Sequence, residues 1–500
     1  MPKLTIDGKE ITVDEGTTVF EAARQVETTI PHFCYHPKLS IAGNCRMCLV
    51  EIEKMPKPQI SCNTVVQEGM VVHTQTENVK ALQKNVLEFI LINHPIDCPV
   101  CDQAGECKLQ GYYMDHSASG SEFNEAKVKK PKRVDLGPNV MLDDERCILC
   151  TRCVRFCDEI SQTGELCVTN RGDRSTLRTF PGKKLENKYS LNTVDICPVG
   201  ALTSKPFRFQ QRVWFLKSVP SICTGCATGC NIYVDHNDGK VFRYKTRENE
   251  EVNQCWTCDE GRLSYTFINE ARLIRPLLKT ENGIEEINKK QAVLTIVEKL
   301  KSEAADNMVF IGSAYESNEN NAALKKLADA LGVKRLEYAY HEVENPSSDD
   351  FLIKADKNPN RAGVKKLSYA EFSGELSGKT VIAMEKIGTS QLEKIRLKKP
   401  QYLILLSSQR SPACELADVI LPVSTFAEQK GSFINFQNRI QKFESALEVK
   451  GEMQSAWQYL QEIAEGLGHA WNIVSSDKLL QEFFNLNYEA IGEQGKVIEN

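Results

Sequence analysis

The chain has 500 residues, 41% hydrophobic and 26% charged, which is the composition of a soluble protein with several domains. Its formal net charge of -5, without any arginine-aromatic tract, excludes a basic surface suited to nucleic acid. No apolar run approaches the ~18 residues of a membrane helix, and the N-terminus lacks the apolar core of a signal peptide, so we expect a cytoplasmic protein.

The cysteines are distributed very unevenly. Eighteen of the 19 lie before residue 260, in tight groups, and only Cys414 follows. A disulfide framework has no reason to stop halfway along a chain, whereas clustered thiolates in a reducing compartment indicate metal. The first half of the chain therefore predicts a series of metal centres.

The N-terminal residues predict a small mixed domain. Residues 3–13 alternate as a strand pair, with Asp7-Gly8 as the two-residue turn. Thr17 or Thr18 can then cap a short helix.

The first cysteine group lies in the loop that follows this helix and around a predicted strand at 49–53. Its spacing, C-x₁₀-C-x₂-C-x₁₃-C, resembles that of a plant-type [2Fe–2S] ferredoxin domain with an enlarged first gap. The predicted ligands are Cys34, Cys45, Cys48 and Cys62. His32 and His36 flank Cys34 and would suggest a Rieske-like centre, but with four cysteines present we interpret them as loop residues.

A helix is predicted over 77–93, where apolar residues recur with the helical period before a proline. The second group follows it and contains only three cysteines, Cys98, Cys101 and Cys107. His94 is the only nearby fourth donor, and we predict that it completes a [4Fe–4S] site. Residues 117–121 read as an exposed loop, and the basic run at 127–133 as a solvated face or a docking site for an acidic partner.

The third group is the most specific. Cys147, Cys150 and Cys153 are spaced C-x₂-C-x₂-C, and Cys197 precedes a proline, which is how ferredoxin-type [4Fe–4S] runs close. Zinc is the alternative, although structural zinc sites usually contain two separated cysteine pairs. We interpret Cys157 as a buried thiol beside the cluster.

The fourth group, spaced C-x₂-C-x₃-C-x₂₇-C, again offers four thiolates. The predicted ligands of this further [4Fe–4S] site are Cys223, Cys226, Cys230 and Cys258. Cys255 could compete with Cys258, but the Cys-Asp-x-Gly-Arg sequence favours Cys258.

Beyond about residue 271 the pattern changes to α/β. Residues 308–311, 380–383 and 402–406 are short apolar runs typical of buried parallel strands. Amphipathic helices are predicted between them, at 321–331 and 390–397. No Walker loop, no G-x-G-x-x-G motif and no catalytic constellation is visible.

The order and spacing of the four groups resemble the large iron–sulfur subunit of respiratory NADH:quinone oxidoreductase (complex I), most specifically over residues 30–262. The resemblance implies a multidomain α+β and α/β fold and the same four ligand sets, the fourth being similar to a cluster of some bacterial members, away from the main electron route. The implied domains are a β-grasp [2Fe–2S] ferredoxin-like domain (1–78), a helical His/Cys-ligated [4Fe–4S] domain (79–118), a ferredoxin-like [4Fe–4S] domain (119–215), a molybdopterin-oxidoreductase-type [4Fe–4S] domain (216–270) and an α/β molybdopterin-oxidoreductase-like domain (271–500).

The C-terminal half looks like a shortened molybdopterin-oxidoreductase domain. The segments at 355–360, 417–422 and 428–435 match that superfamily, but Gln437-Asn438-Arg439 stands where Glu-Gly-Arg is more usual. Because this half is also much shorter than in a pterin-binding enzyme, we expect no molybdopterin.

The resemblance implies an electron-transfer subunit with no substrate-transforming site of its own. Its expected partners are a flavin- and NADH-binding subunit and other cluster-bearing subunits, through which it would lie on the cytoplasmic face of the inner membrane. The alternatives are the equivalent subunit of a soluble NAD-linked hydrogenase or formate dehydrogenase, and a redox-inactive zinc scaffold.

Overall fold

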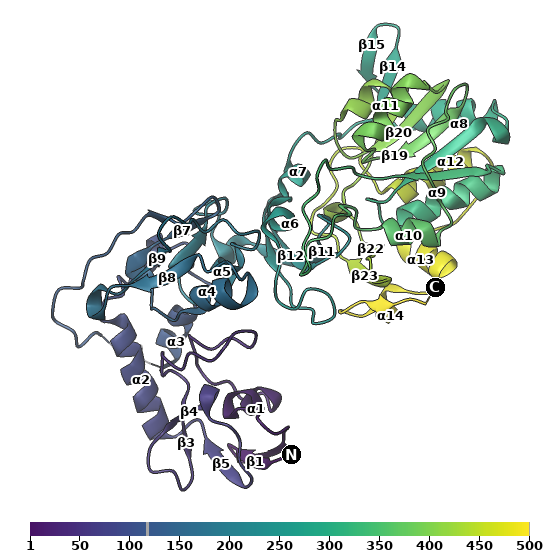
Figure 1. Cartoon of the computed structure of the whole chain (residues 1–500). Coiled ribbons are helices and arrows are strands. Elements are labelled where there is room, and N and C mark those ends of the chain that lie inside the picture. The colour runs from purple at the N-terminus through teal and green to yellow at the C-terminus, as the bar shows by residue number, and fades with distance from the viewer. Residues whose placement is uncertain (117–119, 500) are drawn as a thin grey trace. The chain divides into compact units, whose positions relative to one another are not determined.

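The computed structural model describes residues 1–116 and 120–499. The chain forms two compact units, Met1–Phe215 and Leu216–Asn500, which we call unit 1 and unit 2 (Figure 1). Residues 117–119 of the predicted exposed loop lie outside the described residues. No helix in the described ranges has the length and apolar character needed to cross a membrane.

Unit 1 begins with a mixed five-stranded sheet in the order β2-β1-β5-β3-β4. Its strands are β1 (Lys3–Ile6), β2 (Lys9–Thr12), β3 (Leu49–Ile52), β4 (Gln59–Ile60) and β5 (Met70–His73). Helix α1 (Val19–Gln25) packs its apolar face on this sheet, so the β-grasp expectation is confirmed. The hairpin turn has positive φ at both Asp7 and Gly8, and Thr18, rather than Thr17, caps α1 by accepting from the Glu21 N–H.

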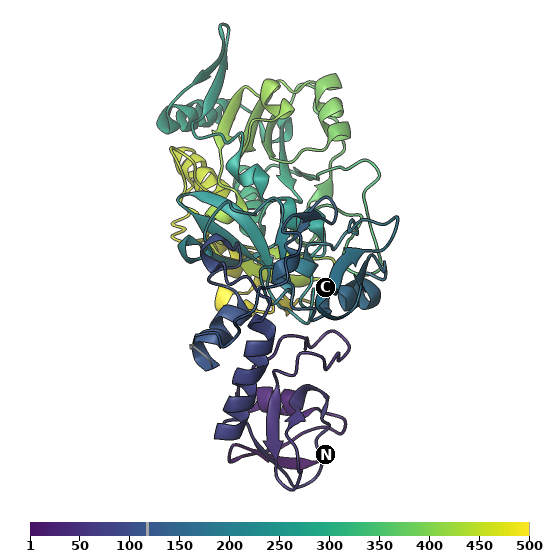
Figure 2. The ribbon, with the colours of Figure 1, turned by 90° about the vertical axis from the view of Figure 1, so that its left-hand side faces the viewer.

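The remainder of unit 1 consists of short elements joined by cysteine loops. The long helix α2 (Glu77–Leu91) is capped by Thr76 and matches the helix predicted at 77–93 (Figure 2). The other elements are α3 (Lys108–His116), α4 (Arg152–Arg155), α5 (Asn192–Asp195), the three-stranded sheet of β6 (Val134–Asp135), β7 (Val140–Leu142) and β10 (Leu202–Ser204), and the hairpin of β8 (Leu166–Thr169) and β9 (Thr176–Thr179).

The basic run at 127–133 is not simply a solvated face. Lys127 Nζ donates to the carbonyls of Leu91 and Ile92, at 2.7 and 2.8 Å, and so caps the end of α2. Lys130 Nζ donates to a backbone carbonyl at 2.6 Å, and Lys132 pairs with three carboxylates. Part of the run therefore fastens the loop that follows α3 to its own unit.

Unit 2 opens with an antiparallel sheet that carries the fourth cysteine group. Its strands are β11 (Lys217–Ile222), β12 (Asn231–Asn237) and β13 (Lys240–Thr246), followed by α6 (Asp259–Leu263) and α7 (Thr266–Asn269).

The rest of unit 2 is built on an eight-stranded sheet in the order β15-β14-β21-β20-β19-β16-β17-β18, in which β16 to β21 are parallel. Its strands are β14 (Leu277–Thr280), β15 (Gly283–Glu286), β16 (Met308–Ser313), β17 (Arg335–Ala339), β18 (Ala370–Glu371), β19 (Thr380–Met384), β20 (Tyr402–Ser407) and β21 (Val419–Pro422). The three predicted strands and the α/β fold are thus confirmed, and the β14–β15 hairpin projects beyond the sheet edge in both views (Figures 1 and 2).

The central strands are buried on both faces, which explains why they read as continuous apolar runs. Alternate residues of β16, β19 and β20 pack against α8 (Lys289–Lys301), α9 (Asn318–Leu331) and α12 (Ala456–Gly466), and the intervening residues pack on the side of α11 (Thr389–Leu397). The remaining elements are α10 (Arg361–Lys366), α13 (Ser476–Phe484), α14 (Tyr488–Ile491) and the antiparallel sheet of β22 (Gly431–Ile434), β23 (Arg439–Phe443) and β24 (Lys496–Val497).

Candidate metal centres

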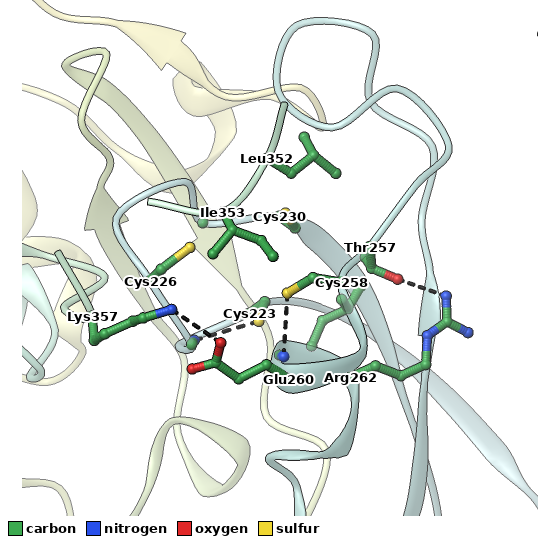
Figure 3. Close-up of a pocket in the computed structure, with 14 residues that line it drawn as sticks. Cys223, Cys226, Cys230, Thr257, Cys258, Glu260, Arg262, Leu352, Ile353 and Lys357 are labelled. Carbon is green, nitrogen blue, oxygen red and sulfur yellow. Dashed lines mark hydrogen bonds and ion pairs between the residues drawn. The ribbon is translucent and has the colours of Figure 1, made fainter. Parts of the chain in front are cut away.

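The fourth cysteine group lines one pocket in unit 2 (Figure 3). The loop between β11 and β12 contributes Cys223, Cys226 and Cys230, and Cys258 comes from the N-terminus of α6. Cys255, the competing candidate, is not among the residues that line the pocket. The backbone N–H of Gly225 donates to the Cys223 sulfur at 3.4 Å, and that of Gly261 to the Cys258 sulfur at 3.3 Å.

Gly261 keeps the space at this pocket open. A Cβ on this residue would lie 2.8 Å from the Cys223 sulfur and 3.3 Å from the Cys258 sulfur. The glycine thus explains the Cys-Asp-x-Gly-Arg pattern, because only a residue without a side chain lets the α6 backbone approach the thiols. Lys357 and Glu260 form an ion pair of 3.0 Å on the pocket wall (Figure 3).

The third group also converges on one pocket, in unit 1. Its walls include all four predicted cysteines, namely Cys147, Cys150, Cys153 and Cys197. Leu149 and Thr151 have φ of 53° and 59°, the left-handed conformation that tightens the backbone between and after the ligands. Cys157 is buried but does not line this pocket, and its carbonyl accepts from the N–H groups of Thr163 and Gly164.

The second group lines a cavity of about 210 Å³ that contains His94, Cys98, Cys101 and Cys107 on its walls. The His94 Nδ1 atom is buried and has no hydrogen-bond partner in the described ranges. Buried polar atoms normally have such a partner, so this nitrogen fits a metal ligand. Burial lowers the pKa of His94 to about 4, so the imidazole is neutral at pH 7, the form that ligates. A Cβ on Gly200 would lie 2.3 Å from the Cys101 sulfur, so this glycine makes room for the thiol.

The first group contains two pairs of neighbouring thiols. The Cys45 thiol beside Cys34 lowers the pKa of Cys34 to about 5, and the Cys62 thiol lowers that of Cys48 to about 7. The Cys34 N–H also donates to the Cys45 sulfur at 3.4 Å. Two pairs fit a two-iron centre, in which each iron takes two thiolates.

The two histidines around Cys34 have partners within the protein. The His32 nitrogens lie 3.0 Å from the Ile30 carbonyl and 3.3 Å from Lys108 Nζ. His36 Nδ1 accepts from the Lys38 N–H at 3.2 Å. These contacts favour the interpretation of both as loop residues over a Rieske-like centre.

The donor chemistry of the pockets suits iron–sulfur clusters. Burial raises the pKa of Cys150 to about 11 and that of Cys147 and Cys258 to about 12, so without iron these thiols keep their protons at neutral pH. Iron must displace those protons, and the nearby backbone N–H groups then stabilise the thiolates. Among the described residues, no three His, Cys, Asp or Glu side chains gather as around a single metal ion.

Two arginines that the sequence did not single out join the first and third sites. Arg155 Nη2 donates to the carbonyls of Cys34, at 2.6 Å, and of Cys150, at 3.2 Å. The buried Arg152 donates to the carbonyls of Tyr35, which follows Cys34, and of Ile196, which precedes Cys197. A single guanidinium therefore fixes a ligand loop of one site against a ligand loop of the other.

The loop that ends in Gly200 joins the third site to the second. Cys197 lines the third pocket, and three residues later Gly200 lines the second. The Pro198 carbonyl between them accepts from the Lys108 N–H at 3.1 Å, directly after Cys107. Sites three and two thus share one short loop.

Five family models match the chain. They are a 2Fe-2S iron-sulfur cluster binding domain (residues 2–77), the NADH-ubiquinone oxidoreductase-G iron-sulfur binding region (83–121), the ferredoxin-like domain of NADH-quinone oxidoreductase subunit 3 (137–203), the molybdopterin oxidoreductase Fe4S4 domain (216–270) and molybdopterin oxidoreductase (379–466).

Curated relatives of the chain are named as subunits of NADH-quinone or NADH-ubiquinone oxidoreductase. The NADH-quinone oxidoreductase G subunit of Rickettsia conorii is 43% identical over 66% of this chain and 49% of its own length. The mitochondrial NADH-ubiquinone oxidoreductase 78 kDa subunit of Neurospora crassa is 41% identical over 67% of this chain and 45% of its own length. The chain belongs to the family of NADH-quinone oxidoreductase G subunits. It spans about half the length of these relatives.

Membership of the G-subunit family agrees with the expected cofactor types, one two-iron domain and several four-iron domains. Among solved structures, a chain of an NAD⁺-reducing [NiFe]-hydrogenase is 31% identical over 42% of this chain and 91% of its own, with a TM-score of 0.39. A likeness of that TM-score decides neither fold nor function. The expectation that no molybdopterin binds stays a prediction.

Proposed function

We propose that the chain holds four iron–sulfur centres and carries electrons within an NADH:quinone oxidoreductase, from a flavin- and NADH-binding subunit toward quinone. The proposed ligand sets are Cys34, Cys45, Cys48 and Cys62 for a [2Fe–2S] centre, and for three [4Fe–4S] centres His94, Cys98, Cys101 and Cys107, then Cys147, Cys150, Cys153 and Cys197, then Cys223, Cys226, Cys230 and Cys258. When bound, these clusters supply one-electron transfer.

The observation that carries the proposal is the continuity of the three sites of unit 1. Arg155 bonds the Cys34 loop to the Cys150 loop, and the loop from Cys197 to Gly200 serves both four-iron sites. The sites therefore follow one another in the order first, third, second. An unbroken row of adjoining redox sites is what a relay requires, whereas zinc sites in a scaffold need no such order.

The chain itself contributes fixed ligand geometry and a dry environment. Burial of most ligand thiols excludes water, and backbone N–H groups at Gly225 and Gly261 stabilise negative charge on sulfur. His94 as a neutral donor leaves its site one negative charge short of an all-thiolate set, a difference that tunes potential.

The expected partners and location follow from the same proposal. Other cluster-bearing subunits of complex I would adjoin unit 1, and the chain would lie peripherally on the cytoplasmic face of the inner membrane through them. The chain spans about half the length of these relatives. The activity of the complete oxidoreductase is therefore part of the same proposal.

The test is metal analysis and low-temperature EPR on the anaerobically purified, dithionite-reduced chain. We expect about 14 irons, from one two-iron and three four-iron centres, without stoichiometric molybdenum. About 10 irons would mean that one four-iron site is empty or wrongly assigned. Zinc in place of iron would overturn the proposal.

A further inference from the structure

Arg146 lies in unit 1 between the third and second candidate sites. It directly precedes Cys147 of the third site, but its side chain turns toward the second. Its Cδ atom and the Cys101 sulfur both lie close to the position that a Cβ on Gly200 would occupy, at 3.6 and 2.3 Å. The aliphatic part of the side chain therefore runs beside the loop that the two sites share.

The guanidinium of Arg146 is held by two carboxylates. Its Nε and Nη2 atoms donate to the two oxygens of Asp97, at 3.0 and 2.8 Å, across 49 positions of the chain. Its Nη1 atom lies 3.2 Å from an Asp143 oxygen. Asp97 directly precedes Cys98 of the second site, so this bidentate pair joins a ligand loop of that site to a ligand loop of the third.

The ion pair is largely removed from water. The side chain of Arg146 is 4% exposed and that of Asp97 is 24% exposed. Lys132 Nζ also donates to Asp97, at 3.1 Å. Against the effect of burial, the hydrogen bonds from Arg146 and Lys132 lower the pKa of Asp97 to about 2, so Asp97 is ionised at neutral pH. Charges fixed in this way are screened by salt much less than charges on the surface.

The charge of Arg146 acts on ligands of the second site. Burial lowers the pKa of His94 to about 4, an effect that Asp97 opposes and Arg146 increases. Burial raises the pKa of the Cys101 thiol, and the charge of Arg146 opposes that rise. The field of Arg146 thus reaches two of the four proposed ligands. A positive charge at this position stabilises the reduced, more negative form of a bound cluster.

Building on the proposed four-centre function, we propose that Arg146 is a positioning residue for electron transfer, which ties the ligand loops of the third and second sites together and raises the reduction potential of the His94 centre. One electron that passes from the third site to the second oxidises the first of them and reduces the other, and no bond or proton changes at Arg146. Asp97 acts in the opposite sense, because its negative charge disfavours reduction.

The test is an EPR-monitored redox titration of the anaerobically purified full chain, which measures the midpoint potential of each centre. The signal of the His94 centre is the one that changes in His94→Ala. We expect Arg146→Gln to lower the ratio of reduced to oxidised centre about tenfold at a fixed potential, a shift of ~59 mV for one electron. A unit charge about 10 Å away, at an effective dielectric constant of about 20, has an effect of this order. Asp97→Asn should shift the potential upward.

Arg174→Gln is the matched control, because Arg174 is an exposed arginine of the same unit, and it should leave the potential unchanged. Full iron content with equal midpoint potentials in the unchanged chain, Arg146→Gln and Asp97→Asn would refute the role of Arg146 and leave the proposed function standing. Shifts of the two variants in the same direction would refute it as well, since a purely structural role predicts no opposite signs.

Two further outcomes are also decisive. If Arg146→Gln does not retain the His94 centre, Asp97→Asn settles the question, because a raised potential supports the role of Arg146 and an unchanged one contradicts it. Zinc in place of iron in the unchanged chain would overturn the proposed function itself, and the role of Arg146 with it.

Discussion

Arg155 is the residue on which the contact between two candidate centres depends most directly. Its guanidinium bonds carbonyls of Ser40, Cys34 and Cys150, so one side chain serves three backbone acceptors. We expect Arg155→Gln to leave some of these acceptors unsatisfied, at a cost of about 1–3 kcal/mol, and to loosen the Cys34 loop. Hydrogen exchange of residues 34–48 should become faster.

Arg174→Gln is the matched control for Arg155, because Arg174 is exposed at the end of a short 3-10 helix (Gly172–Arg174) of the same unit. It should leave that exchange unchanged. Equal protection of residues 34–48 in Arg155→Gln and the unchanged chain would show that the contact does not hold the loop.

The buried Glu316 side chain makes the folding stability of unit 2 depend on pH. Burial and the neighbouring Glu385 carboxylate raise its pKa to about 8, opposed by the hydrogen bond from Asn320 and by the charge of Lys386. The folded state therefore favours the neutral acid, whose stabilising effect is present below about pH 4.5 and is lost as the pH rises through about 8.

We expect Glu316→Gln to remove much of this dependence, because an amide keeps an acceptor for Asn320 but cannot ionise. At pH 8 the variant should be more stable than the unchanged chain by about 1 kcal/mol or more. The measurement is hydrogen exchange of α9, corrected for intrinsic rates, at pH 5.5 and pH 8. A stability difference that is the same at both pH values would contradict the assignment.

At the scale of elements, the features that the sequence predicted are local ones. The Asp7-Gly8 turn, the helix at 77–91 and the apolar strands of the large sheet each depend on neighbouring residues, and each is found. The cysteine groups are also local, apart from Cys197, which its following proline identified, and Cys258, which its Cys-Asp-x-Gly-Arg sequence identified.

What the sequence could not predict are contacts between distant segments. The bond from Arg155 to Cys34 spans 121 positions, and no spacing rule links an arginine to a carbonyl at that separation. The role of Lys127 as a helix cap was missed for the same reason. The unpredicted β12–β13 hairpin, in contrast, has a local turn signal in Asp238-Gly239. The spatial order of the sites therefore came from the fold alone.

The loop from Cys197 to Gly200 is the element whose disruption should affect two sites at once. Gly200→Ala would place a Cβ 2.3 Å from the Cys101 sulfur, a distance that real contacts essentially never show. We expect loss of iron from the His94 site and an altered EPR signal from the Cys147 site, because Cys197 lies on the same loop. Gly111→Ala, in α3 with nothing within 4 Å, is the control and should keep all its iron.

At the scale of the whole molecule, the centres fall into two groups. Three proposed sites lie in unit 1 and are joined by its own hydrogen bonds and loops, while the fourth lies in unit 2. Such separation predicts that the fourth site can be removed alone.

We expect Cys226→Ser to lower the iron content by about four per chain, because a four-iron site that loses a buried thiolate no longer holds its cluster. The EPR signals of the three centres in unit 1, and their reduction by NADH in the assembled complex, should stay as they are. Cys255→Ser is the matched control, since this cysteine does not line the pocket, and it should keep the full iron content. Loss of iron in Cys255→Ser but not in Cys226→Ser would show that the ligands of the fourth site include Cys255 and not Cys226. Slower reduction of the unit 1 centres in Cys226→Ser would instead place the fourth centre on the main electron route.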